Sequence, residues 1–270
     1  MAIKNGLKFN IFDGKVVLES IEDETIIKVD IPMEVDGYPV VMIDEQAFWN
    51  CYEIEEINIP DSVDTIQDEA INGCFGLKRI TLGKKVDFIG TGNFALCDSL
   101  EEINVVDGSE RYMSKEGVLY SKNNIWLLKY PGGKSNTEFV VEKEVSVIQD
   151  EAFSDSRNLI KIIIENDDCE IGIGAFYACK SLETVKLPGN LKIIPSNAFF
   201  NCMSLKEISI PKSVELIEEG AFEACTSLKK INYNGSSEDW NKINFKRNWN
   251  SYIKKIKVVC TDKVLEIVNK

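Results

Sequence analysis

Hydrophobic residues recur along most of the chain at a constant interval of twenty-three positions. The clearest unit is an Ala-Phe pair, found at Ala47-Phe48, Ala152-Phe153, Ala175-Phe176, Ala198-Phe199 and Ala221-Phe222, with Ala70-Ile71 and Asn93-Phe94 in two further positions. An isoleucine lies four positions before each pair, and apolar residues follow its first member by seven, ten and twelve positions. This agreement predicts a repeat protein in which each copy forms one coil of a solenoid.

The last two columns of each copy form an apolar-x-apolar segment, as in Ile57-Asn58-Ile59 and Ile208-Ser209-Ile210. Such alternation with a period of two predicts short strands. Stacked in register, one strand from each coil would form a parallel β-sheet with strands about 4.8 Å apart. The inward residues would then form a continuous core, and the segment from the isoleucine to the Ala-Phe pair would turn the chain on the opposite side.

One interval, from Asn93 to Ala152, is more than twice as long as the others. Within it, Phe139 and Val141 stand where the strand of a further coil is expected, and Val145 fits the apolar position after that strand. The interval therefore divides into one long coil and one coil of the usual length. It predicts a hidden eighth coil that carries an insertion of 13 residues.

Both ends depart from the repeat, as the caps of a solenoid must. Residues 8–18 and 26–31 have strand patterns, with a turn at Asp13-Gly14. Near the other end, a group of apolar residues is expected to cover the last coil: Trp240, Ile243, Phe245, Trp249, Tyr252 and Ile253. We expect an N-terminal cap and first irregular coil at residues 1–46, a solenoid at 47–232 with an inserted hairpin at about 106–134, and a C-terminal cap at 233–270.

These columns resemble the BspA-like class of bacterial leucine-rich repeats, which combine a Leu-x-x-Ile-x-Leu strand with an Ile-Gly-x-x-Ala-Phe turn. The match is close at Ile171–Phe176 (IGIGAF) and Leu205–Pro211 (LKEISIP), and Gly117–Tyr120 and Tyr130–Lys134 resemble a hairpin of that family. The resemblance implies a right-handed leucine-rich-repeat superhelix with a parallel β-sheet on its concave face and short turns on its convex face. Because members are often surface or secreted proteins and some are adhesins, it also implies a binding role outside the cell.

Charge and composition disfavour several functions. The chain carries 44 acidic and 31 basic residues, a net charge of −13, so nucleic acids and anionic membranes would be repelled. It has no histidine, which removes His-dependent triads and the commonest metal ligand. No apolar run is long enough to cross a membrane, and the segment after Met1 lacks a signal-peptide core. We expect either a cytoplasmic protein or one whose leader has been removed.

Most of the cysteines share one column, four positions after the first member of the Ala-Phe pair. They are Cys51, Cys74, Cys97, Cys179, Cys202 and Cys225. A ladder places thiols along a line, whereas zinc needs ligands around a point. Stacked identical side chains also point the same way, which does not suit disulfides. We interpret these cysteines as small buried residues and expect neither a metal nor a cofactor.

Other motif-like segments do not carry chemistry. Gly132–Ser135 lacks the earlier glycine of a P-loop, because Leu128 occupies that position. Acidic pairs such as Glu101-Glu102 and Glu218-Glu219 have the residue types of a glycosidase, but no aromatic-lined cleft is implied near them. We interpret these pairs as a solvated charged face and expect a protein that is not an enzyme.

Two sets of residues are candidates for protein binding. The first contains the outward strand positions Glu56, Asn58, Arg79, Thr81, Glu102, Asn104, Lys161, Ile163, Thr184, Lys186, Glu207, Ser209, Lys230 and Asn232. Their mixed charges suit protein recognition, although the same pattern would also serve solubility alone. The second set contains the aromatic residues of the insertion, Tyr112, Tyr120, Trp126 and Tyr130. Aromatic residues are enriched at interface hot spots, although these rings could instead pack the hairpin on the solenoid.

The sequence therefore predicts a non-catalytic leucine-rich-repeat protein that binds other proteins, with a cell-surface or secreted adhesion role favoured. The alternative is an intracellular scaffold or assembly protein, which the missing leader and the reduced-looking cysteines favour. Neither the partner nor the oligomeric state follows from the sequence.

Overall fold

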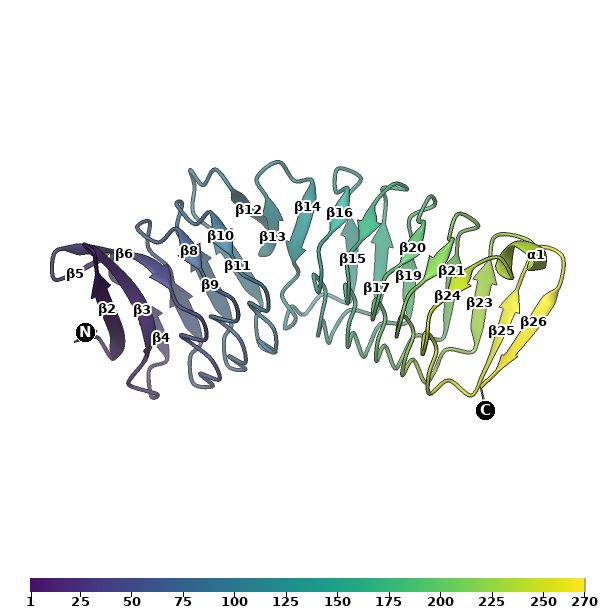
Figure 1. Cartoon of the computed structure of the whole chain (residues 1–270), viewed down its shortest axis with the longest axis horizontal. Coiled ribbons are helices and arrows are strands. Elements are labelled where there is room, and N and C mark those ends of the chain that lie inside the picture. The colour runs from purple at the N-terminus through teal and green to yellow at the C-terminus, as the bar shows by residue number, and fades with distance from the viewer. Residues whose placement is uncertain (270) are drawn as a thin grey trace. The chain divides into compact units, whose positions relative to one another are not determined.

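The computed structural model describes residues 1–269, which form two compact units. Unit 1 contains residues 1–123 and 131–134, and unit 2 contains residues 124–130 and 135–269. Each unit is a solenoid in which a regular coil gives a longer strand to one side and a two-residue strand to the other (Figure 1). The predicted solenoid with parallel strands is therefore confirmed within each unit.

Unit 1 contains two sheets and a hairpin. The long-strand sheet has the order β11-β9-β7-β4, with β4 (Lys28–Asp30), β7 (Glu56–Asn58), β9 (Arg79–Leu82) and β11 (Glu102–Val105). The opposite sheet has the order β1-β2-β3-β6-β8-β10, with β1 (Ala2–Lys4), β2 (Leu7–Phe12), β3 (Lys15–Ile21), β6 (Tyr38–Ile43), β8 (Thr65–Ile66) and β10 (Phe88–Ile89). Strand β5 (Glu34–Val35) pairs with β6, and β12 (Tyr112–Lys115) pairs with β13 (Val118–Ser121).

Unit 2 contains four short sheets and one helical turn. Its long strands are β15 (Glu138–Val141), β17 (Lys161–Ile164) and β19 (Thr184–Lys186), followed by β21 (Glu207–Ile210), β23 (Lys230–Tyr233), β25 (Lys255–Val259) and β26 (Val264–Val268). The opposite side holds β14 (Trp126–Lys129), β16 (Val147–Ile148) and β18 (Glu170–Ile171), followed by β20 (Ile193–Ile194), β22 (Leu216–Ile217) and β24 (Asn244–Phe245). Helix α1 spans Ser237–Trp240.

The period of the repeat sets the register of the strands. Glu56 lies beside Arg79, Arg79 lies beside Glu102, and Glu207 lies beside Lys230. Equivalent residues of successive coils are therefore direct neighbours, and each apolar column of the sequence becomes a continuous buried row.

Both sheets of unit 2 are interrupted at the same coil, between β19 and β21 and between β18 and β20. A proline accounts for the interruption between the short strands β18 and β20. In other coils the amide after the short strand donates to the preceding coil, as Glu218 N does to the Ile194 carbonyl at 2.9 Å, and Pro195 has no such amide.

A ladder of aromatic rings fills the core of unit 2. Phe153, Phe176, Phe199 and Phe222 stack with ring centroids 5.0 to 5.4 Å apart, and all four are fully buried. Tyr130 extends the ladder by one coil, because its ring lies 5.4 Å from that of Phe153 and its amide donates to the Ala152 carbonyl as the phenylalanine amides do to later alanines. Tyr130 thus occupies the phenylalanine position of its own coil.

The tyrosine hydroxyl at this position lowers the stability of the fold. Its oxygen is buried without a hydrogen-bond partner, and burial raises the pKa of Tyr130. Since an unsatisfied buried hydroxyl loses its hydration, Tyr130→Phe should raise the free energy of unfolding by about 1 kcal/mol. Urea titrations of the two proteins measure the difference. A loss of stability in the variant would show that the hydroxyl contributes favourably.

The structure refines the predicted insertion. Leu127 pairs with Ile148, so it is the short-strand residue of the eighth coil. The stretch from Ile103 to Leu127 is fifteen positions longer than the equivalent stretch from Ile162 to Ile171. The turn that follows Leu127 is two positions shorter than the one that follows Ile148. The insertion of 13 residues is therefore the net result of fifteen added and two removed.

The two caps close their solenoids differently. In unit 1, β2 and β3 form the predicted hairpin, and its turn needs positive φ at Asp13 (48°) and Gly14 (71°). In unit 2, the ring of Trp249 meets Phe222 edge-on at 6.2 Å and ends the aromatic ladder. Trp240 is also buried, as expected, but Tyr252 is 76% exposed, so its predicted place over the core is wrong.

Candidate protein-binding surfaces

The outward strand positions form an accessible surface on each unit, and all fourteen predicted members keep contact with solvent. Alternation explains this, because every second strand residue points away from the core. The strand surface of unit 1 contains Lys28, Asp30, Glu56, Asn58, Arg79, Thr81, Glu102 and Asn104. The strand surface of unit 2 contains Glu138, Val140, Lys161, Ile163, Thr184, Lys186, Glu207, Ser209, Lys230, Asn232, Lys257 and Val259.

Charges of alternating sign cross the strand surface of unit 1. Lys28 Nζ lies 2.8 Å from a Glu56 oxygen, and Arg79 lies 3.5 Å from Glu56 and 3.2 Å from Glu102. The hydrogen bond with Lys28 lowers the pKa of Glu56, and those with Asn104 and then Arg79 lower the pKa of Glu102. The carboxylates of this row are therefore already engaged with neighbouring coils.

The strand surface of unit 2 has a different charge balance. It has four lysines and two glutamates, and only two of the lysines are paired. Lys161 lies 3.2 Å from Glu138, and Lys230 lies 3.0 Å from Glu207. Within the described residues, Lys186 and Lys257 have no ion pair.

A groove of about 550 Å³ lies at the interruption between β19 and β21. Its walls include Lys161 and Ile163 on β17, Lys186 on β19, and Ser209 on β21. Asp167 also lines the groove, and its carboxylate accepts a hydrogen bond from the Gly189 amide at 3.1 Å. The groove therefore joins an unpaired lysine to an apolar side chain on an open stretch of the sheet.

The predicted aromatic cluster of the insertion is not a surface cluster. Tyr120 and Tyr130 are buried at 5% and 0% exposure, so their inclusion among the binding residues is wrong. Tyr112 is half-buried and its hydroxyl donates to the Asp87 carbonyl at 3.1 Å, which holds the hairpin on unit 1. Trp126 is exposed, but it lies on β14 of unit 2.

Exposed aromatic residues occur instead at the turns, at positions outside the predicted binding set. In unit 1, Trp49 and Tyr52 are about half exposed, and the Tyr52 and Phe75 rings lie 5.5 Å apart. In unit 2, the Tyr177 and Phe200 rings stack at 5.0 Å. These residues stand two or five positions after the first member of the Ala-Phe pair. An inspection of those two columns would have found them.

The cysteine column has a structural role. Each of the five buried thiols of the column donates to a carbonyl of the preceding coil, as Cys179 does to Phe153 at 3.0 Å and Cys202 does to Phe176 at 3.1 Å. All eight cysteines are free, and seven are buried. The prediction of small buried residues at a turn is confirmed for five of the six column cysteines, whereas Cys51 is only half-buried. The hydrogen bonds explain why a small donor suits the column.

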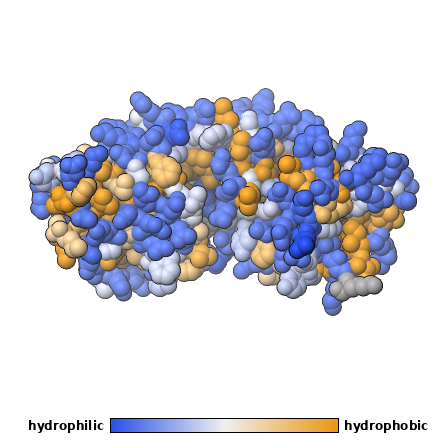
Figure 2. Space-filling model, in the orientation of Figure 1, coloured by the Kyte–Doolittle hydropathy of each residue, from blue (hydrophilic) through white to orange (hydrophobic). Residues whose placement is uncertain are grey.

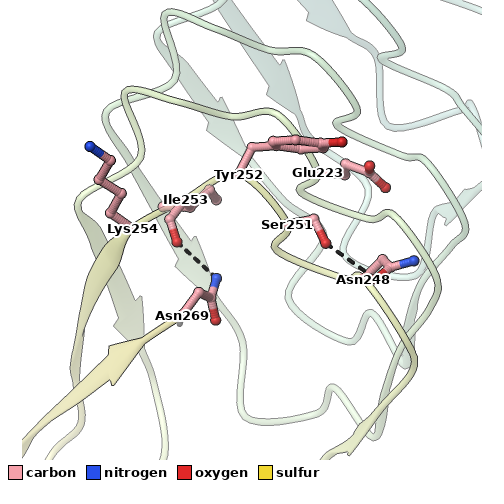
Figure 3. A pocket seen from close by; sticks show the side chains of 7 residues that line it. All are labelled: Glu223, Asn248, Ser251, Tyr252, Ile253, Lys254 and Asn269. Atoms are coloured by element: carbon pink, nitrogen blue, oxygen red, sulfur yellow. Dashed lines mark hydrogen bonds between the residues drawn. The ribbon is translucent and has the colours of Figure 1, made fainter.

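The cap of unit 2 has a second hollow, of about 540 Å³, lined by residues that include Tyr252, Lys254 and Asn269 (Figure 3). The Asn269 side chain points at the Ile253 carbonyl and donates to it at 2.8 Å, and it also donates to the Asn250 carbonyl at 3.0 Å. These bonds connect the end of the last strand to the preceding turn, so the Asn269 side chain stabilises the cap.

Other kinds of site find no support in the described part of the chain. Between residues 1 and 269, no three histidine, cysteine or acidic side chains gather where they could hold a metal. No helix there has the length and apolar character of a membrane span. Hydrophilic residues cover most of the face seen in Figure 2, with hydrophobic residues between them. The strand surfaces are therefore the best-defined candidates for binding.

Solved structures of several bacterial proteins share this fold. A leucine-rich cell surface protein of Faecalibacterium prausnitzii is 20% identical, with a TM-score of 0.57 over 90% of this chain and 97% of that one. The pneumococcal vaccine antigen PcpA is 19% identical, with a TM-score of 0.66 over 94% and 86%. A leucine-rich repeat protein of Bacteroides ovatus is 24% identical, with a TM-score of 0.61 over 96% and 71%. No curated protein gave a significant match.

The coils, their register and these structures define the chain as a leucine-rich-repeat solenoid. The BspA type leucine-rich repeat region matches residues 23–125 and 130–258, in six copies. The chain therefore belongs to the BspA-type leucine-rich repeat family, which confirms the resemblance seen in the sequence.

Proposed function

We propose that this protein is a non-catalytic binding protein whose strand surfaces contact partner proteins. The observation that carries the proposal is the register of the long strands, which holds outward side chains of successive coils side by side. Such a surface is extended and built on a rigid backbone, so a partner can bind it with little ordering cost. Mixed charge and few apolar residues suit a protein partner that associates reversibly.

The favoured setting is the bacterial cell surface or the secreted fraction. This part of the proposal is supported by family membership and by likeness in fold to a leucine-rich cell surface protein and a vaccine antigen. An intracellular scaffold is the second candidate, favoured by eight free cysteines. Mass spectrometry of surface, secreted and cytosolic fractions of the source cells distinguishes the two, since an exclusively cytosolic protein contradicts the favoured setting.

The binding function can be tested by capture on the full chain. Immobilised protein is exposed to host-cell and bacterial surface extracts, and captured proteins are purified and titrated by biolayer interferometry. Arg79→Glu in unit 1 breaks two ion pairs on a strand surface, and Lys230→Glu in unit 2 breaks one. At least one should weaken binding by about tenfold if its residue lies in the interface.

The matched control is Lys192→Glu, which also breaks an exposed ion pair, with Glu215, but beside the short strand β20. It should leave affinity unchanged. The proposal fails if no captured protein binds at micromolar concentration, or if the control weakens binding as much as the two strand-surface variants. Circular dichroism confirms that each variant is folded.

A further inference from the structure

Four lysines, each from a different coil, lie on the strand surface of unit 2. Lys161, Lys186 and Lys230 come from β17, β19 and β23, and Lys257 from β25 lies directly beside Lys230. Two members of this surface carry negative charge, and each is already paired with a lysine. The surface therefore has an excess of two positive charges, in a chain whose net charge is −13.

The two unpaired lysines are available to form ion pairs with carboxylates of a partner. Within residues 1–269, Lys186 and Lys257 have no acidic side chain in ion-pair distance, and both are exposed. Glu266 on β26 is the strand neighbour of Lys257, but its carboxylate pairs with Lys255 at 2.8 Å.

The spacing of the two lysines suits one short segment of a partner. Lys186 lies on β19 and Lys257 on β25, with β21 and β23 between them, and Lys186 stands two positions further along its strand than the row of Lys257, so the two are roughly 16 Å apart. About five residues of an extended peptide cover that distance. Two carboxylates on one such peptide can therefore reach both lysines.

Apolar side chains lie beside these charges. Val140 on β15 is a direct neighbour of Ile163 on β17, which is a direct neighbour of Lys186. Val140 is 44% exposed, and Ile163 lines the groove at the sheet interruption. A ligand that pairs with Lys186 thus meets an aliphatic surface that continues into the groove. Asp167, which also lines the groove, would repel a carboxylate placed beside it.

We propose that the strand surface of unit 2 binds an acidic, extended segment of a partner protein in which aliphatic residues accompany the carboxylates. The inference rests on the protein-binding function proposed above and names the chemistry of the partner. The carboxylates pair with Lys186 and Lys257, and an aliphatic side chain packs on Val140 and Ile163. Unit 1 does not offer this site, because the basic groups of its strand surface, Lys28 and Arg79, are already paired.

A peptide fits this surface better than a nucleic acid does. Single-stranded nucleic acids bind through bases stacked on aromatic side chains together with a basic groove. The strand surface of unit 2 has aliphatic residues next to its lysines and no aromatic residue among its members. The large negative charge of the remaining chain would also repel a long phosphate backbone.

Fluorescence anisotropy with the full chain tests the inference. Three labelled peptides of equal length alternate valine with glutamate, with glutamine or with lysine, and an oligothymidylate serves as a nucleic-acid probe. The glutamate peptide should bind tightest, and added salt should weaken it because exposed charges are screened. The double variant Lys186→Glu with Lys257→Glu should weaken it by at least about tenfold. Ile163→Ser should weaken it by about threefold through lost apolar contact.

Lys246→Glu is the matched control, since Lys246 is an exposed lysine of unit 2 that directly follows the short strand β24. It should leave the glutamate peptide unaffected. Equal binding of the glutamate and glutamine peptides, or tighter binding of the oligothymidylate, overturns the inference. If captured proteins depend on Arg79 or Lys230 while the glutamate peptide does not bind, only this inference fails and the general binding function stands.

Discussion

Replacing Phe199 with alanine should lower the free energy of unfolding by about 3–5 kcal/mol. The Phe199 ring is fully buried between those of Phe176, at 5.0 Å, and Phe222, at 5.2 Å. Its removal leaves a cavity within a ladder whose coils are held in register by backbone hydrogen bonds on both sides, such as that from Phe199 N to the Ala221 carbonyl at 2.8 Å. The coils therefore have little freedom to collapse into the space, which places the cost in the upper part of the range for buried aromatic residues.

Phe200→Ala provides the control, because Phe200 is the next residue in the chain and its ring stacks on Tyr177 at 5.0 Å, but it is only half-buried. Its removal leaves no enclosed cavity, so the loss should stay below about 2 kcal/mol. Urea unfolding followed by circular dichroism gives both values. Similar losses in the two variants would mean that the buried ladder adds nothing beyond the removal of an aromatic surface from water.

The sequence predicted the solenoid because the same residue pattern recurs in every regular coil. One copy of the pattern, with its isoleucine, Ala-Phe pair and apolar-x-apolar strand, would be weak support for a solenoid. Repeated copies also predict that equivalent residues are neighbours, and Ile57, Ile80 and Ile103 are indeed paired in successive strands. Tyr130 was predicted to be a surface residue of the insertion, whereas it is buried in the phenylalanine position, because its turn is two positions shorter than the others. A column defined by fixed spacing then misses the residue that fills the phenylalanine position.

The candidate surface was predicted only in part for a similar reason. Outward positions between β7 and β23 follow the period of the repeat and were found. Lys257 lies beside Lys230, but the interval between them is four positions longer than the repeat, so no fixed period connects the two. Val140 belongs to the hidden coil and pairs with Ile163. The unpaired state of Lys186 depends on which side chains reach it in space, which sequence spacing does not give.

Alkaline solution should destabilise the protein steeply, in the range from about pH 9 to about pH 11. Burial raises the pKa of the Cys179 thiol to about 12 and that of Cys169 to about 11, and it also raises the pKa of Cys202. The hydrogen bond with Cys97, together with burial, raises the pKa of Cys74. A thiol in the unfolded chain ionises near pH 8.5. Above that pH the unfolded chain holds fewer protons than the folded one, so the free energy of unfolding falls as pH rises and levels off only above the folded pKa.

Each fully buried thiol should contribute a loss of about 1.4 kcal/mol per pH unit. Cys179 and Cys202 both meet that condition, since neither side chain is exposed. Together they should remove about 3 kcal/mol between pH 9 and pH 10, on a total stability of about 5–15 kcal/mol that is typical of folded proteins. Urea titrations at successive pH values measure the slope directly.

Cys179→Ala separates this effect from the titration of lysines and tyrosines. The variant should be less stable than the parent at pH 7, because the Phe153 carbonyl loses its thiol donor, yet its stability should fall less steeply with pH, by about 1.4 kcal/mol per unit. The two curves should therefore converge as pH rises toward about 11. Parallel curves would show that the thiols are not responsible. Convergence would instead show that the small hydrogen-bonded cysteines hold the coils together only while protonated, which makes the cysteine column a structural part of the repeat.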